Sequence, residues 1–75
     1  MRTEKQILKD FEKLGYSPLR KNGEQFMFLE EEFDVIHFDL ENKMYYKTFG
    51  GYDGASITMA EHKLLHELFE IWGWL

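Results

Sequence analysis

The sequence predicts an α+β domain in which an N-terminal and a C-terminal helix pack on one face of a three-stranded antiparallel sheet. Three observations predict this fold. Both ends carry helix-capping patterns, three segments between them are rich in strand-forming residues, and short polar turns separate those segments. The element order is α-β-β-β-α in two layers around one core, and 75 residues suffice for one domain.

The first helix is expected over residues 3–14. Thr3 and Gln6 have the spacing of a capping box, in which each side chain accepts a hydrogen bond from the other residue's backbone N–H. An apolar stripe recurs at helical spacing in Ile7, Leu8, Phe11 and Leu14. Gly15 can adopt the left-handed conformation that ends a helix, and Pro18 prevents any continuation.

Three strands are expected between the helices, over residues 24–30, 33–40 and 43–49. Sequential hairpins are the simplest topology, because only short turns separate the segments. In the second hairpin, a two-residue loop would place Ile36 opposite Lys47, whereas a three-residue loop would place Phe38 opposite Tyr46. We expect the three-residue loop because it pairs more apolar side chains, and a slip of one residue would exchange the faces.

The last helix begins after Thr58, which forms a second capping box with Glu61. Its apolar stripe consists of Leu64, Leu65, Leu68, Ile71, Trp72 and Leu75. Glu61 falls in the same stripe, which its capping role explains. Gly73 ends the helix, and Trp74 is expected to fold back toward Phe69, as in a Schellman ending.

Composition narrows the function classes. A net charge of −5 works against a nucleic-acid backbone or an anionic membrane as the partner. The chain has no cysteine, which excludes disulfides and thiolate metal sites and fits a reducing compartment. The first residues are polar and unlike a secretory signal, and no apolar run approaches the roughly 20 residues of a membrane span. We therefore expect a cytoplasmic protein without a membrane partner.

Aromatic residues are numerous for so small a core: seven Phe, four Tyr and two Trp. Some of them should reach the surface, where aromatic side chains are typical of protein interfaces. We predict an interaction surface either on the second sheet face, with Val35, His37 and Tyr45, or at the aromatic C-terminus, with Trp72 and Trp74. The expected partner is a protein or a second copy in a homodimer.

Residues 22–42 carry seven acidic residues and no Lys or Arg. The acidic patch at the first hairpin consists of Glu30, Glu31, Glu32 and Asp34. One interpretation is a solubilising hairpin whose charges deter strand-to-strand aggregation. The other is a patch that docks a basic protein surface, with strong salt dependence as its mark.

Nucleic-acid binding is an alternative that depends on a basic surface. The basic residues near the first helix are Arg2, Lys5, Lys9, Lys13, Arg20 and Lys21. Strand aromatics could stack on bases, namely Phe26, Phe28, Tyr45 and Phe49. Such stacking platforms normally lie in a basic groove, and the central segment is acidic, so nucleic acid is not the expected partner.

Catalytic and metal-binding patterns are weak. His62 and His66 are four residues apart, with Glu70 one turn on, a spacing that can chelate a metal. The segment lacks the Glu that directly follows the first His in a zincin motif, so we expect a solvated face with a His66–Glu70 pair. No nucleophile elbow surrounds Ser17 or Ser56, and the glycine-rich loop at residues 50–54 contains no phosphate-binding motif. We expect neither an enzyme nor a cofactor.

The layout resembles that of many small uncharacterised proteins encoded by bacteria and their phages. They also place short strands between two helices and end a capped last helix near Gly-Trp, as in Thr58 to Trp74 here. The resemblance covers the whole chain and implies a bacterial or phage cytosolic protein. It transfers no catalytic or binding residue.

Overall fold

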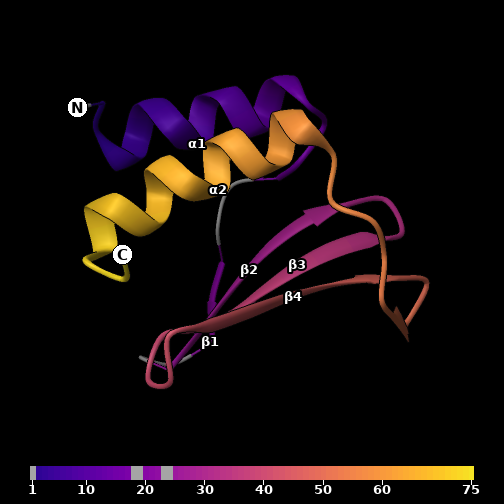
Figure 1. Cartoon of the computed structure of the whole chain (residues 1–75). Coiled ribbons are helices and arrows are strands. Elements are labelled where there is room, and N and C mark those ends of the chain that lie inside the picture. Colours follow the sequence, from indigo (N-terminus) through magenta and orange to yellow (C-terminus); the bar gives the residue numbers. More distant parts are fainter. Residues whose placement is uncertain (1, 18–19, 23–24) are drawn as a thin grey trace.

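The computed structural model describes residues 2–17, 20–22 and 25–75. Both helices cover one face of an antiparallel sheet, so the predicted α+β fold class is confirmed (Figure 1). The elements are α1 (Glu4–Lys13), β1 (Arg20–Asn22), β2 (Phe26–Glu31), β3 (Asp34–Asp39), β4 (Met44–Phe49), β5 (Tyr52–Asp53) and α2 (Met59–Trp72). The predicted strand start at Glu24 and the helix-stopping role of Pro18 lie outside the described residues.

The sheet has the strand order β1-β2-β3-β4-β5, and every neighbouring pair is antiparallel. The three predicted strands form its centre. The two edge strands were not predicted, because segments of three and two residues are too short to show an alternating pattern. Short edge strands also limit pairing with other chains.

Local chemistry sets the helix ends as predicted. Thr3 and Thr58 both cap their helices, and both capping boxes are present. Gly73 ends α2 with a φ of 74°, a left-handed conformation that glycine adopts without strain. The Trp74 backbone N–H donates to the Phe69 carbonyl at 2.9 Å, and the two rings stack with centroids 5.0 Å apart, as in the predicted Schellman ending.

The register of the second hairpin differs from our expectation. Ile36 pairs with Lys47, and Phe38 pairs with Tyr45 rather than with Tyr46. The expected three-residue loop is therefore wrong, and the alternative register is the observed one. The slip of one residue exchanges the faces on which the β4 side chains lie relative to β3.

Polar interactions account for this register. At the turn, the Asp39 carboxylate accepts backbone N–H groups from Glu41 and Asn42, each at 3.1 Å. Within the sheet, the register directs Lys47 toward the helices, where its ammonium group donates to the Glu61 carboxylate. The expected register counted only apolar cross-strand pairs and therefore included neither of these polar interactions.

The core lies between the helices and the sheet. Its buried side chains are Ile7, Phe11, Tyr16, Met27, Leu29, Ile36, Phe38, Leu64, Leu65, Leu68 and Phe69. Burial of these apolar groups is the main favourable contribution to folding. Among the described residues, no helix has the length and apolar character that crossing a bilayer requires.

Candidate functional site

The sheet has a second face that the helices do not cover (Figure 1). Met27, Leu29, Ile36 and Phe38 point into the core, so the alternate residues of the same strands point the other way. We call this the open face. By register, its described side chains are those of Phe26, Phe28, Glu30, Val35, His37, Asp39, Met44, Tyr46 and Thr48.

An aromatic ladder crosses the middle of the open face. The His37 ring contacts the Phe28 ring edge-on, with the ring centroids 5.4 Å apart, and stacks on the Tyr46 ring, with the centroids 4.4 Å apart. His37 Nε2 also lies 3.0 Å from Thr48 Oγ1. Met44 and Tyr46 are 57% and 53% exposed, so the ladder and its flank present large apolar groups to solvent.

The predicted interaction surface is only partly on this face. Val35 and His37 lie there as expected. Tyr45 does not: its ring packs against Phe69 of α2 at 4.8 Å, on the helix side of the sheet. The register slip explains this correction, and Tyr46 takes the position on the open face that we expected Tyr45 to hold.

The two tryptophans close one end of the core. The Trp72 ring meets Phe38 edge-on at 5.2 Å, and its Nε1 donates to the Glu4 carboxylate at 2.9 Å. Trp74 stacks on Phe69. Both are half-buried against the core, so they form a group separate from Val35 and His37.

The acidic patch is divided between the two faces. Glu30 lies on the open face, whereas Glu31 and Asp34 lie on the helix side. Glu32 is exposed in the turn with a φ of 46°. Asp34 Oδ2 is 3.8 Å from the ammonium group of Lys47, so this carboxylate is part of an internal ion pair.

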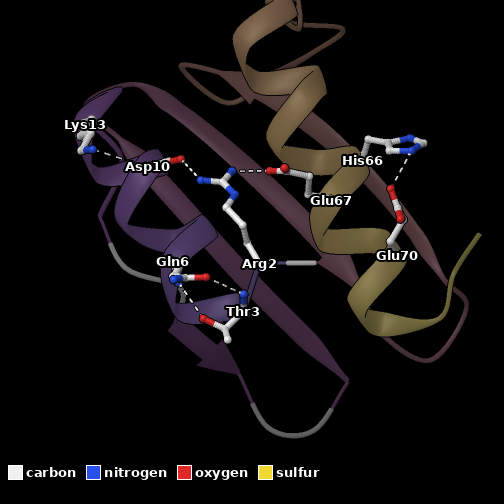
Figure 2. A network of polar contacts seen from close by, with 8 residues as sticks. All are labelled: Arg2, Thr3, Gln6, Asp10, Lys13, His66, Glu67 and Glu70. Carbon is white, nitrogen blue, oxygen red and sulfur yellow. Dashed lines mark hydrogen bonds and ion pairs between the residues drawn. The ribbon is translucent and has the colours of Figure 1, made fainter.

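Among the described basic side chains of the first helix region, Arg2 and Lys13 form ion pairs (Figure 2). The Arg2 guanidinium donates to Glu67 and Asp10 and so links α1 to α2. These hydrogen bonds, first the one to Glu67 and then the one to Asp10, raise the pKa of Arg2, and the bond that Asp10 accepts lowers the pKa of Asp10. Lys13 Nζ lies 3.5 Å from Asp10, and the side chains of Arg20 and Lys21 lie outside the described structure.

The two candidate metal ligands lie on the exposed side of α2. His66 Nε2 is 2.9 Å from Glu70 Oε1, so the predicted His66–Glu70 pair is confirmed (Figure 2). His62 is exposed one turn earlier. Within the described part of the chain, no group of three or more His, Cys, Asp or Glu residues is placed to hold a metal ion.

A buried polar cluster beneath the start of α2 was missed by the sequence analysis. The side chains of Lys47 and Glu61 are 6% and 5% exposed. Lys47 Nζ donates to Glu61 Oε1 and Oε2 at 3.1 and 3.0 Å and to the Ser56 carbonyl at 3.0 Å. The Tyr16 hydroxyl donates a hydrogen bond to Glu61 Oε2. The cluster therefore joins β4, the start of α2 and the segment after α1.

A sequence signal for the cluster was present. Glu61 lies in the apolar stripe of its helix, and we explained it by capping alone. The Thr58 backbone N–H does donate to Glu61 Oε1 at 2.8 Å, so the capping role is correct. A charge in an apolar stripe indicates that a partner of opposite charge is buried with it, and the structure shows that this partner is Lys47.

Acid should weaken this cluster. Burial acts to raise the pKa of Glu61, but hydrogen bonds from Thr58, Tyr16 and Lys47 outweigh it and lower the pKa below its ordinary 4.5. A lowered folded-state pKa gives stability that is full above the unfolded value and is lost as the pH falls through the folded value. We expect the urea concentration at the unfolding midpoint to decrease as the pH is lowered beneath about 4.5. The Glu61→Gln variant should show a smaller decrease. An unchanged pH profile in the variant would contradict the expectation.

Comparisons with protein-family models, curated proteins and solved structures found no match for this chain.

Proposed function

We propose that the chain is a non-enzymatic, cytoplasmic protein-interaction domain that binds a protein partner, another copy of itself or a different protein, through the open face. The aromatic ladder of Phe28, His37 and Tyr46, with the exposed Met44 beside it, is the observation that carries the proposal. Contiguous apolar groups outside a core are typical of interaction sites. Aromatic and Met side chains are enriched where proteins meet.

Charge favours a protein partner over nucleic acid. Two acidic residues, Glu30 and Asp39, lie on the open face beside the aromatic ladder. Stacking platforms for bases depend on a positive surround. Arg2 before α1 and Lys13 at its end are both in ion pairs, which reduce the positive charge that the nucleic-acid alternative requires. An apolar surface with a basic rim would complement the open face.

The buried cluster supports the non-enzymatic part of the proposal. The Lys47 ammonium group has three N–H bonds, and Glu61 and Ser56 supply three acceptor oxygens. A general base or nucleophile needs a lone pair that can reach a substrate. We therefore assign this cluster to folding.

Affinity capture with matched methionine variants tests the proposal. Met44 is on the open face and Met59 is on α2, and both are exposed. Lysine at position 44 would face Asp39 across the strands, so Met44→Lys keeps the fold while placing a charge in the interface. The tagged wild-type chain and the Met59→Lys variant should both recover the same partner from a lysate of the native host. The Met44→Lys variant should recover at least about tenfold less of that partner. Equal recovery by both variants would contradict the proposal, provided that circular dichroism shows both are folded.

A further inference from the structure

We propose that a pocket at the β4–β5 end of the sheet binds the guanidinium group of an arginine side chain from a partner protein. The pocket has a volume of about 460 Å³ and is lined by Asp34, Lys47, Phe49, Tyr52 and residues 54–56. It lies on the helix side of the sheet, so it is distinct from the open face and independent of the function proposed for that face.

Two exposed aromatic rings stand next to a carboxylate in this pocket. Asp34 pairs with Phe49 across β3 and β4, and Phe49 pairs with Tyr52 across β4 and β5. Their side chains therefore emerge in one row on one sheet face. Phe49 and Tyr52 are 57% and 79% exposed, and the Phe33 ring extends the row, with its centroid 6.2 Å from that of Phe49. The core uses none of these rings.

The charges at the pocket favour a cation. Lys47 directs its N–H groups to Glu61 and Ser56, and its Nζ is 3.8 Å from Asp34 Oδ2, beyond hydrogen-bond length. Among the described residues, no group donates a hydrogen bond to the Asp34 carboxylate, whose side chain is 27% exposed. Glu61, which does not line the pocket, already balances the charge of Lys47, so the charge that remains in the pocket is that of Asp34. The Asp34 carboxylate can therefore accept hydrogen bonds from a ligand.

The combination of rings and carboxylate selects a guanidinium group. Aromatic faces attract cations, and arginine stacks on them because its guanidinium is planar and weakly hydrated. The same group presents five N–H donors, which can bind a carboxylate such as that of Asp34, to which no described group donates a hydrogen bond. A quaternary ammonium group has no N–H for Asp34, and a lysine ammonium is more strongly hydrated and cannot stack. Arginine satisfies both parts of the site.

Amide NMR of the full chain, titrated with N-acetylarginine methylamide, tests this proposal. We expect saturable shifts at Asp34, Phe49, Tyr52 and residues 54–56, with a dissociation constant on the order of 1 mM for so small a probe. The corresponding lysine derivative should bind at least about fivefold more weakly. Absence of saturable shifts at these residues, or equal binding of the two derivatives, would overturn the proposal.

Variants separate this pocket from general electrostatics and from the open face. Asp34→Asn should weaken arginine binding at least about tenfold, because it removes the charged acceptor and keeps the shape. Glu32→Gln, which changes the net charge equally from the same hairpin, should leave binding unchanged. Tyr52→Ala should weaken it severalfold, whereas Tyr46→Ala on the open face should not. Equal effects of Asp34→Asn and Glu32→Gln would overturn the proposal, and neither result depends on the open face having a partner.

Discussion

Replacing Lys47 by methionine should destabilise the domain by about 3–5 kcal/mol, because the Glu61 carboxylate would remain buried without its cation. A domain of this length is expected to have a total stability of about 4–11 kcal/mol, so the loss would be a large fraction of the whole. The Tyr16 hydroxyl and the Thr58 N–H would still donate to Glu61, but neither carries a charge. Urea denaturation at neutral pH measures the change.

A double variant isolates the cause of that loss. Lys47→Met combined with Glu61→Gln removes both charges and keeps an amide that can still complete the capping box. We expect it to recover most of the lost stability, because no uncompensated charge is then buried. Lys63→Met, on the exposed side of α2, should change stability by less than about 0.5 kcal/mol. A double variant no more stable than Lys47→Met would show that the ion pair is not the reason.

Phe38→Ala should destabilise the domain by about 3–5 kcal/mol through the cavity that it leaves. Phe38 is 0% exposed and contacts the rings of Phe69 and Trp72, with centroids 6.2 and 5.2 Å away. It therefore connects the centre of the sheet to the end of α2. Thermal or urea unfolding monitored by far-UV circular dichroism gives the magnitude.

The matched control for Phe38 is Phe33, which is 62% exposed in the turn between β2 and β3. Phe33→Ala should change the free energy of unfolding by less than about 0.5 kcal/mol, since it leaves no internal cavity. Similar losses from the two substitutions would mean that the core does not lie where the helices cover the sheet.

The helices and the order of the strands were predictable because their signals are local. The Thr3–Gln6 and Thr58–Glu61 boxes each span three residues, and Gly73 ends its helix through its own backbone conformation. Such features depend on the nearest turn of chain and little on the rest of the molecule. They appear in the sequence as they do in the structure.

The register of β4 was not predictable from apolar pairing, because its polar partner is distant in sequence. Glu61 lies 14 residues from Lys47, and the pair is buried only once α2 has packed on the sheet. Because successive side chains of a strand point to opposite faces, the wrong register predicted Tyr45 on the open face instead of the helix side. Similarly, the Arg2–Glu67 pair spans 65 residues and needs both helices in place.

The candidate site was predictable only where it depends on a single strand. Val35 and His37 follow from the alternation within β3, which needs no knowledge of register. The division of the acidic patch and the row of Asp34, Phe49 and Tyr52 follow from pairing between strands. The short strand β5 completes that row, and its two residues carry no sequence signal of their own.

Photocrosslinking in the native host tests most directly whether the open face binds a protein. A photoreactive phenylalanine analogue replaces Tyr46 on the open face or, as the control, Met59 on α2. We expect position 46 to give an adduct of defined mass, with a second copy or with one other protein, and position 59 not to give it. No adduct at position 46, or the same adducts at both positions, would contradict the proposed function.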